Sequence, residues 1–300
     1  MSRPSDTTRR TLCRSLAAGL TLAAWPRRAR ADEDAQARLL ALAQGFRGRL
    51  GVAVRDTGNG RGLAHAADDP FPLCSTFKVL AAAAILARVE RGAETLARPL
   101  PYTAADLDSY APVARRGLEG GRSQGTMTLG EACAAAVVWS DNTAANLVLR
   151  TLGGPAALTA WLRETGDTTT RLDRWEPELN TAIPGDLRDT TTPAAMLATL
   201  DRILLGSVLT PESRARLAGW MVESRTGLKR LRAGLPPTWT VGDKTGSGAN
   251  GTANVVAIVR PPGRAPLLAA VYITQSEAPD AVRDFIHAEV GRLIAALADA

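Results

Sequence analysis

The chain has 300 residues, 45% of them hydrophobic and 22% charged, which supports a packed core and excludes an intrinsically disordered protein. Its formal net charge of +6 comes largely from residues 1–31, because removing their seven arginines and one acid leaves 29 basic and 29 acidic residues. The remainder is thus close to neutral, has no basic run interleaved with aromatic residues, and is not expected to bind nucleic acid.

The N-terminal segment has the pattern of an export signal. Arg9 and Arg10 open a basic region, residues 15–25 form a short apolar stretch, and residues 29–31 match a small-x-small cleavage site. A bilayer-spanning helix needs roughly 20 apolar residues, and this run has about 11. We therefore predict a twin-arginine-type signal over residues 1–31, and a mature protein that is periplasmic or secreted and is not attached to a membrane.

The rest of the chain shows strand patterns toward its two ends and helical patterns in the middle. Apolar periodicity predicts helices over residues 34–46, 79–91, 129–138, 143–152, 155–165, 193–205 and 278–297. Apolar runs bounded by turns predict a hairpin that begins with residues 50–55, and strands over residues 238–245, 254–259 and 267–274. We expect an α+β fold: a five-stranded antiparallel sheet flanked by helices, from residues 32–69 and 222–300, with an all-helical domain of residues 70–221 inserted.

Cysteines and histidines are too few for several kinds of site. Cys13 falls in the signal, and the spacing of Cys74 and Cys133 does not match a zinc site, so two buried thiols are favoured over a disulfide. His65 and His287 are the two histidines, one in a predicted strand and one in the last helix. The sequence therefore argues against a histidine-based catalytic triad and a histidine-rich metal site, and we expect no metal and no organic cofactor.

Lysine is rare in this chain, and its placement is informative. Three of the 36 basic residues are lysines; Lys78 follows Ser75 by three positions, and Lys244 begins the triplet Lys244-Thr245-Gly246. A guanidinium stays charged at any working pH, whereas a buried ammonium can lose its proton and act as a base. At the first turn of a predicted helix, Ser75 and Lys78 share a face near free backbone N–H groups, which favours a lysine-activated serine nucleophile. The alternative is a serine helix cap beside a surface lysine.

Two further motifs follow in order along the chain. Ser140-Asp141-Asn142 lies between two predicted helices, and Lys244-Thr245-Gly246 ends a predicted strand. Taken singly, the first can be an ordinary helix cap and the second a polar strand end. Their order and separation, together with Ser75 and Lys78, strengthen the case for a serine enzyme.

With these motifs the chain resembles the class A serine β-lactamases, from about Gln44 to its C-terminus. The segment 174–180, Arg-Trp-Glu-Pro-Glu-Leu-Asn, looks like the omega-loop signature of that family. The resemblance implies an ion pair between Arg174 and Asp189 at the base of the loop and a cis peptide bond before Pro177. It also implies an active site in the cleft between the sheet domain and the helical domain.

The resemblance assigns catalytic roles to five residues. Ser75 would form an ester with the opened β-lactam, and Glu176 would activate the water that hydrolyses this ester. Ser140 would pass a proton to the departing ring nitrogen. The positive charge of Lys244 would destabilise the ammonium form of Lys78. Either Lys78 or Glu176 can serve as the base for ester formation, and the sequence leaves this choice open.

Further residues are implied to bind the substrate. Asn180 would hold the hydrolytic water, Asn142 the amide side chain of the antibiotic, and Tyr110 would stack at the cleft entrance. Lys244, Thr245 and Ser247 suit the substrate carboxylate, and the backbone N–H groups of Ser75 and Ser247 would form an oxyanion hole.

Three departures from the family pattern stand out. Many members carry a carboxylate-binding arginine where this chain has Ala253, and Arg230 matches an alternative position, so we predict that Arg230 substitutes. Cys74 precedes the nucleophile as in carbapenem-hydrolysing relatives, but their partner cysteine is here Gly248, which argues against carbapenemase activity. About five extra residues fall in segment 118–126.

The expected function is hydrolysis of penicillins and cephalosporins by a monomeric, exported enzyme, and hence antibiotic resistance. A penicillin-binding D,D-peptidase shares the serine and lysine motifs but usually lacks the omega-loop glutamate and often has a membrane anchor. A β-lactam sensor that stays acylated is a second alternative, and Glu176 argues against it. The preferred antibiotics are not evident from the sequence.

Overall fold

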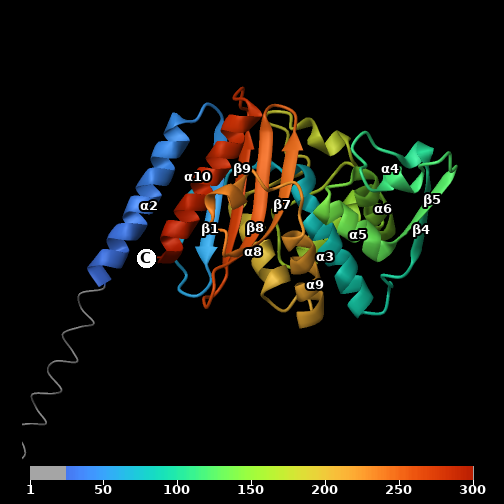
Figure 1. Ribbon diagram of the computed structural model, residues 1–300, viewed down its shortest axis with the longest axis horizontal. Coiled ribbons are helices and arrows are strands. Elements are labelled where there is room, and N and C mark those ends of the chain that lie inside the picture. The colour runs from blue at the N-terminus through green and yellow to red at the C-terminus, as the bar shows by residue number, and fades with distance from the viewer. Residues whose placement is uncertain (1–24, 300) are drawn as a thin grey trace, which may run out of the picture.

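The computed structural model describes residues 25–299 (Figure 1). The predicted Arg9–Arg10 signal motif lies outside these residues. The helices are α2 (Trp25–Gly45), α3 (Phe77–Glu90), α4 (Ala114–Gly117), α5 (Leu129–Val138), α6 (Asn142–Leu152), α7 (Pro155–Glu164), α8 (Pro193–Leu204), α9 (Pro211–Val222) and α10 (Asp280–Asp299). The strands are β1 (Arg49–Asp56), β2 (Gly62–His65), β3 (Phe71–Pro72), β4 (Pro99–Thr103), β5 (Gln124–Thr128), β6 (Thr190–Thr191), β7 (Thr240–Gly248), β8 (Thr252–Arg260) and β9 (Leu267–Thr274).

The main sheet has five antiparallel strands in the order β2-β1-β9-β8-β7, as predicted. Segments from both ends of the chain build it, because β1 pairs with β9 in the register Val52↔Val271. Every residue of β9 is buried. A separate hydrophobic core lies on each face of the sheet, and successive residues of β8 point alternately into one core and the other. Val255 packs on one face of the sheet and Val256 on the other. The continuous apolar runs in these strands therefore reflect helices on both faces.

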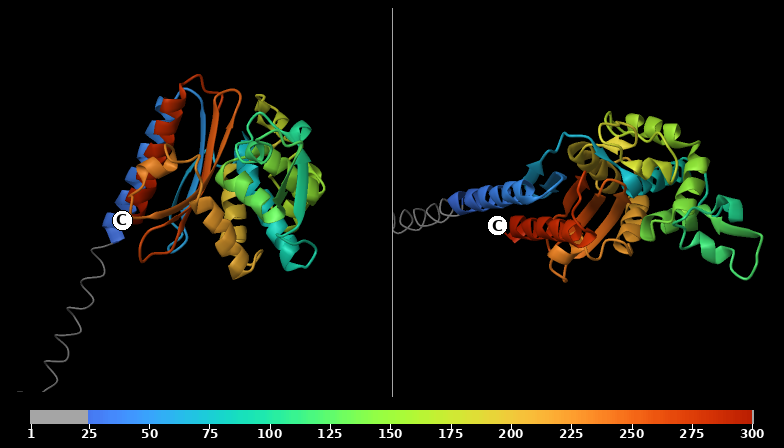
Figure 2. Two further views of the ribbon diagram at one scale, coloured as in Figure 1. Left: turned by 45° about the vertical axis from the view of Figure 1, so that its right-hand side comes forward. Right: turned by 90° about the horizontal axis from the view of Figure 1, so that it is seen from above.

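Helices α2 and α10 cover one face of the sheet, and the remaining helices lie on the other side (Figures 1 and 2). In α10, Ile286, Val290, Leu293 and Leu297 recur at helical spacing and join the core beneath this face. The helix predicted over residues 34–46 is longer in the structure and begins at Trp25. Within residues 25–299, none of the helices has the length and hydrophobicity that crossing a membrane requires.

Helix α3 runs through the centre of the opposite layer, where α5, α6 and α9 pack around it. Its residues 77–87 are all buried, which explains why this segment is almost uniformly Ala, Val, Leu and Ile. A capping box of Thr128 and Glu131 begins α5, and the Asp141 side chain caps α6. These caps place residues 139–141 beside the N-terminal end of α3.

The prediction of a wholly helical middle was wrong in two places. Strands β4 and β5 form a separate two-stranded antiparallel sheet at the outer edge, and β3 pairs with β6. In β4, Leu100 and Tyr102 are buried in alternation, but Pro99 and Pro101 weaken the strand pattern in the sequence. A two-stranded sheet tolerates these prolines because N–H groups on the outer edge of β4 need no partner strand.

His287 lies buried in α10, with Nε2 3.1 Å from the carbonyl oxygen of Ala253. Burial lowers the pKa of His287 to about 3, and the nearby positive charge of Arg230 contributes to the lowering. An unfolded chain binds this proton below about pH 6.5, whereas the folded protein does not until about pH 3. The free energy of unfolding therefore decreases as the pH falls from about 6.5 to about 3, because protonation of His287 favours the unfolded chain.

Replacement of His287 by glutamine is therefore expected to flatten the pH dependence of stability. The histidine should account for about 2.5 kcal/mol of the unfolding free energy lost by the wild type between pH 7 and pH 4.5. Urea denaturation at both pH values measures this loss, and a glutamine at the partly exposed His65 is the matched control. A His287→Gln variant with the wild-type loss between the two pH values would contradict the expectation.

Candidate active site

Ser75 lies in the short helix η1 (Cys74–Thr76), which leads directly into α3. The preceding Cys74 has φ +43°, a conformation that non-glycine residues seldom adopt and that places the serine at the start of the helix. The side chain of Ser75 is largely buried, and its Oγ lies 3.2 Å from Oε1 of Glu176. A nucleophile and a carboxylate base are thus within hydrogen-bond distance although 101 residues separate them.

Lys78 follows one turn later, and its ammonium contacts three residues of the site: Glu176, Ser140 and Asn142. Its Nζ lies 2.9 Å from Oε1 of Glu176, and both side chains have no exposed surface. The same ammonium donates to the Oδ1 of Asn142 at 2.6 Å and to the carbonyl oxygen of Ser140 at 2.8 Å. Burying a charge is costly unless it is paired and hydrogen-bonded, and Lys78 meets both conditions.

Lys244 reaches the site from β7. Its Nζ donates to the Oγ of Ser140 at 2.9 Å and to the carbonyl oxygen of Thr245 at 2.7 Å. Burial lowers the pKa of Lys244 well below its ordinary value, and the positive charge of Lys78 adds to this effect, while Asp243 and Glu176 oppose it. The hydroxyl of Ser140, which lies 3.5 Å from the Nζ of Lys78, therefore sits between two ammonium groups. This is a suitable position for a proton relay.

Glu176 is fixed from both its backbone and its side chain. Its backbone N–H donates to Oδ1 of Asn146, and the Nδ2 of Asn146 donates to the carbonyl oxygen of Glu176. The amide of Asn180 donates to the second carboxylate oxygen, Oε2. The peptide bond between Glu176 and Pro177 is cis, as the sequence suggested.

The eleven residues singled out in the sequence meet at one cleft of about 560 Å³, a size suited to a small-molecule ligand. Eight of them line it: Ser75, Tyr110, Ser140, Asn142, Asn180, Arg230, Thr245 and Ser247. Lys78, Glu176 and Lys244 lie directly beneath, in contact with the lining residues. Within residues 25–299, His, Cys, Asp and Glu side chains form no cluster of three or more that could hold a metal ion.

The chain matches the model of the Beta-lactamase enzyme family over residues 34–297. It is 49% identical over 257 residues to a beta-lactamase of Streptomyces lavendulae, covering 85% of this chain and 83% of that protein. It is 47% identical over 253 residues to the carbapenem-hydrolyzing beta-lactamase KPC of Klebsiella oxytoca, covering 84% and 85%. A solved ancestral class A beta-lactamase aligns with a TM-score of 0.83 and 56% identity, covering 87% and 98%. The chain belongs to the class A beta-lactamases.

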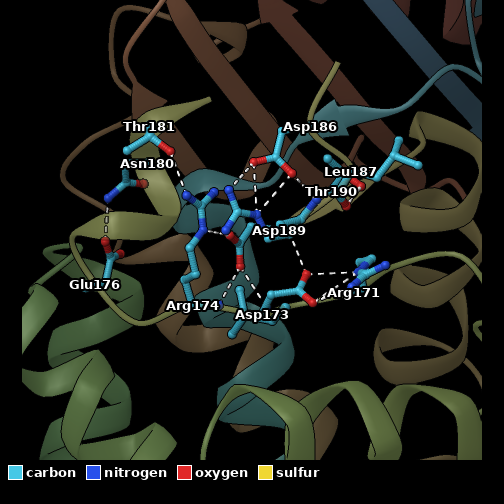
Figure 3. Close-up of polar contacts among 12 residues, drawn as sticks. Arg171, Asp173, Arg174, Glu176, Asn180, Thr181, Asp186, Leu187, Asp189 and Thr190 are labelled. Carbon is cyan, nitrogen blue, oxygen red and sulfur yellow. Dashed lines mark hydrogen bonds and ion pairs between the residues drawn. The ribbon is translucent and has the colours of Figure 1, made fainter. Parts of the chain in front are cut away.

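In this class A enzyme the loop that carries Glu176 is closed at its base by two aspartates (Figure 3). Asp189 pairs with the guanidinium of Arg174 at 2.5 Å, as expected, and accepts hydrogen bonds from the backbone N–H groups of Asp173 and Arg174. Asp173 in turn accepts from the backbone N–H of Asp189 at 2.9 Å. The two ends of the loop are therefore held together by reciprocal bonds that do not depend on the ion pair alone.

Arg230 lies at the other end of the cleft of this β-lactamase. One guanidinium nitrogen, Nη2, donates to the Oγ of Ser247 at 2.8 Å, and Nη1 donates to the carbonyl oxygens of Gly246 and Asn254. Its Nε is paired with Asp284 of α10 at 3.1 Å. Burial lowers the pKa of Arg230, and the negative charge of Asp284 opposes this. The guanidinium is thus held beside the hydroxyl groups predicted to bind the substrate carboxylate.

Cys74 and Cys133 of the β-lactamase are both buried free thiols, which confirms the preference for thiols over a bridge. Burial raises the pKa of Cys133 to about 12 and also raises that of Cys74. A Cβ atom at Gly248 would lie 2.7 Å from the Sγ of Cys74 and 2.6 Å from the carbonyl oxygen of Asn180. The strand and the 178–181 turn are therefore too close for a side chain at position 248 without displacement.

Three residues that position the catalytic side chains were not predicted from the sequence: Asn146, Asp173 and Asp284. Asn146 lies one turn after Asn142 on α6, so a pair of asparagines on one helix face was an available signal. Asp173 precedes Arg174 directly and could have been examined as part of the loop base. Asp284 gives no local signal, because 54 residues separate it from Arg230.

Proposed function

We propose that this enzyme hydrolyses the β-lactam ring of penicillins and cephalosporins through an ester on Ser75, and thereby confers antibiotic resistance. The observation that carries the proposal is the position of the buried Glu176 carboxylate. One of its oxygens lies within hydrogen-bond distance of Ser75 and Lys78, and the other accepts from Asn180. A base placed against the nucleophile in this way can serve the hydrolysis of an ester formed there.

In the first half-reaction, Ser75 Oγ attacks the lactam carbonyl carbon and loses its proton to Glu176 or to Lys78. The two candidate bases are in contact with each other: Oε1 of Glu176 lies 3.2 Å from Ser75 Oγ and 2.9 Å from Lys78 Nζ. The ring C–N bond then breaks, and the nitrogen takes the proton of the Ser140 hydroxyl. Ser140 takes a proton in turn from the Lys78 ammonium, which lies 3.5 Å from its Oγ, while Lys244 donates a hydrogen bond to the same oxygen. The backbone N–H groups of Ser75 and Ser247 are our candidates for stabilising the oxyanion.

In the second half-reaction, a water attacks the ester carbonyl and gives a proton to Glu176. The C–O bond to Ser75 then breaks, and Glu176 returns this proton to the departing Ser75 Oγ, 3.2 Å from Oε1. Asn180 is suited to hold this water. Its Oδ1 is buried without a hydrogen-bond partner among the described residues, while its Nδ2 is committed to Glu176. An acceptor beside the base can therefore take one water hydrogen while Glu176 takes the other.

A turnover assay with three antibiotics tests the proposal. Benzylpenicillin, an oxyimino cephalosporin and a carbapenem are followed by loss of ring absorbance, with a Ser75→Ala variant as the background. We expect many turnovers per enzyme on the penicillin, because the deacylation base is in place. One equivalent consumed without further turnover would indicate a sensor, and cleavage of D-Ala-D-Ala peptides without penicillin turnover would indicate a peptidase.

Arg230 is proposed to bind the ring carboxylate together with Thr245 and Ser247. Its replacement by alanine is expected to raise the KM for benzylpenicillin about tenfold, since a charge-assisted contact of this kind contributes roughly 1.5 kcal/mol. Steady-state kinetics measures the change, and alanine at the neighbouring exposed Lys229 is the control. Unchanged KM and turnover in Arg230→Ala would refute the assignment.

Export, domain division and oligomeric state are also proposals. The N-terminal pattern supports export by a twin-arginine-type signal, with cleavage near Ala31, and we propose that the exported protein is a monomer. The separate cores on the two faces of the sheet support a division into a sheet domain, 32–69 with 222–300, and a helical domain, 70–221. N-terminal sequencing of the exported protein would test cleavage near Ala31, and light scattering would test the monomeric state.

A further inference from the structure

Arg225 is an exposed side chain that lines the cleft and has no assigned role. It follows α9, on the segment that connects the helical layer to β7. Its backbone N–H donates to the carbonyl oxygen of Val138 at 2.9 Å, so its main chain is held in place. Across residues 25–299, by contrast, its guanidinium makes no hydrogen bond and no ion pair.

The two lysines of the cleft are committed to partners within the protein. Lys78 is paired with Glu176 at 2.9 Å, and both groups are fully buried. Lys244 is buried and donates to Ser140 at 2.9 Å. Neither ammonium has the exposure needed to receive an additional anionic group from solvent.

The remaining cation, Arg230, is the one proposed to bind the ring carboxylate, and it also has partners within the protein. Its Nε is paired with Asp284, and both terminal nitrogens donate to groups on β7 and β8. Of the four cationic side chains in or directly beneath the cleft, Arg225 is therefore the one whose charged group has neither a hydrogen bond nor an ion pair to another described residue. A second anion on a ligand would find its counter-charge there.

The backbone fixes which end of the cleft Arg225 occupies. The hydroxyl of the next residue, Thr226, lies 2.6 Å from that of Thr245, in the proposed carboxylate site. Val138, which binds the Arg225 backbone, precedes the proton relay Ser140 by two residues. Arg225 is thus next to the positions proposed for the ring carboxylate and the ring nitrogen.

In a cephalosporin, the C3 substituent is attached to the carbon next to the one that bears the ring carboxylate. A nucleus bound by Arg230, Thr245 and Ser247 directs this substituent toward the end of the cleft where Arg225 lies. We infer that Arg225 forms a subsite for an anionic C3 substituent, so that the enzyme favours dianionic cephalosporins over their neutral counterparts. This inference rests on the proposed function, because it uses the proposed orientation of the substrate.

Two cephalosporins with the same C7 side chain provide the test. Ceftriaxone carries an acidic triazine group at C3 that is ionised at neutral pH, and cefotaxime carries a neutral acetoxymethyl group. Their apparent inhibition constants are measured in competition with benzylpenicillin hydrolysis, which also works for cephalosporins that turn over slowly. The readout is the ratio of the two constants, so a general loss of binding does not count as support.

In Arg225→Gln we expect the apparent inhibition constant of ceftriaxone to rise about fivefold relative to that of cefotaxime, because one partly exposed charge pair is lost. Arg225→Lys should keep most of the wild-type ratio, and added salt should reduce the preference of the wild type but not of Arg225→Gln. Glutamine at the exposed Lys229 is the matched control and should leave the ratio unchanged.

A wild-type ratio retained in Arg225→Gln would overturn the inference, and so would an equal loss for both compounds, which would indicate a role with the shared ring carboxylate. A ratio lowered as much by Lys229→Gln would also overturn it, because the effect would then be a general positive potential. Turnover of benzylpenicillin by the wild type separates these results from failure of the proposed function.

Discussion

Replacing Glu176 by glutamine is expected to convert the enzyme into one that forms the ester on Ser75 and cannot remove it. Glutamine keeps the size of the side chain and can still accept from Lys78 through its amide oxygen, but it cannot take a proton from water. Turnover of benzylpenicillin should fall about 10³-fold, within the range of general-base contributions. Intact-protein mass spectrometry should show a stable adduct with the mass of the whole antibiotic.

Glu178→Gln is the matched control for this experiment. It makes the same change two residues away in the same loop, at a side chain that is exposed and does not reach the cleft. We expect this variant to turn over at the wild-type rate without an adduct. If Glu176→Gln showed no adduct, or Glu178→Gln also accumulated one, the assignment of Glu176 as deacylation base would fail.

Replacing Asp189 by asparagine is expected to loosen the base of the loop that holds Glu176. Asp189 is buried and has φ +56°, a conformation that asparagine tolerates, so the substitution isolates the loss of charge from backbone strain. The partly buried guanidinium of Arg174 loses its counter-ion, which should lower the free energy of unfolding by about 3 kcal/mol.

The kinetic effect of Asp189→Asn should fall mainly on hydrolysis of the ester. Ser75 on η1 and Lys78 on α3 keep their positions, whereas Glu176 depends on the loop, and small displacements of a catalytic group can cost about 100-fold in rate. Pre-steady-state kinetics with benzylpenicillin separates the two steps, and thermal denaturation reports stability.

Asp186→Asn provides the comparison, because Asp186 pairs with the exposed Arg188 in the same loop. Solvent screens that pair, so we expect little change in either stability or rate. Equal effects of the two substitutions would contradict a specific role for the Asp189 carboxylate. A drop in acylation as large as the drop in deacylation would also contradict it.

The secondary structure was predictable where local patterns were strong and was missed where they were weak. The apolar runs of β8 and β9 and the Ala-rich α3 gave clear signals, and all are present. The pair of strands β4 and β5 was missed because the strands are short and prolines obscure the alternation of buried and exposed residues in β4. Helix α2 was predicted too short, since residues before position 34 have the composition of a signal.

The candidate site divides in a similar way. Residues within a motif were evident, because Ser75 and Lys78 lie one helical turn apart and Glu176 and Asn180 lie in one loop. Asp284 was not evident, since its contact with Arg230 spans 54 residues. The contact of Asn146 with Glu176 spans 30 residues, and only the spacing of Asn146 from Asn142 on α6 pointed to it. No local spacing rule connects residues at such separations.

The sequence by itself determined which side chains could carry the chemistry: a serine with a lysine one turn on, a loop glutamate and a second lysine at a strand end. Only the tertiary structure decided their environment. Folding buries Lys244 beside Lys78, which lowers the pKa of Lys244, and leaves the Arg225 guanidinium without a counter-ion among the described residues. Solvation and charge at a point depend on every chain segment that meets there, and these segments converge only when the sheet and the helices pack.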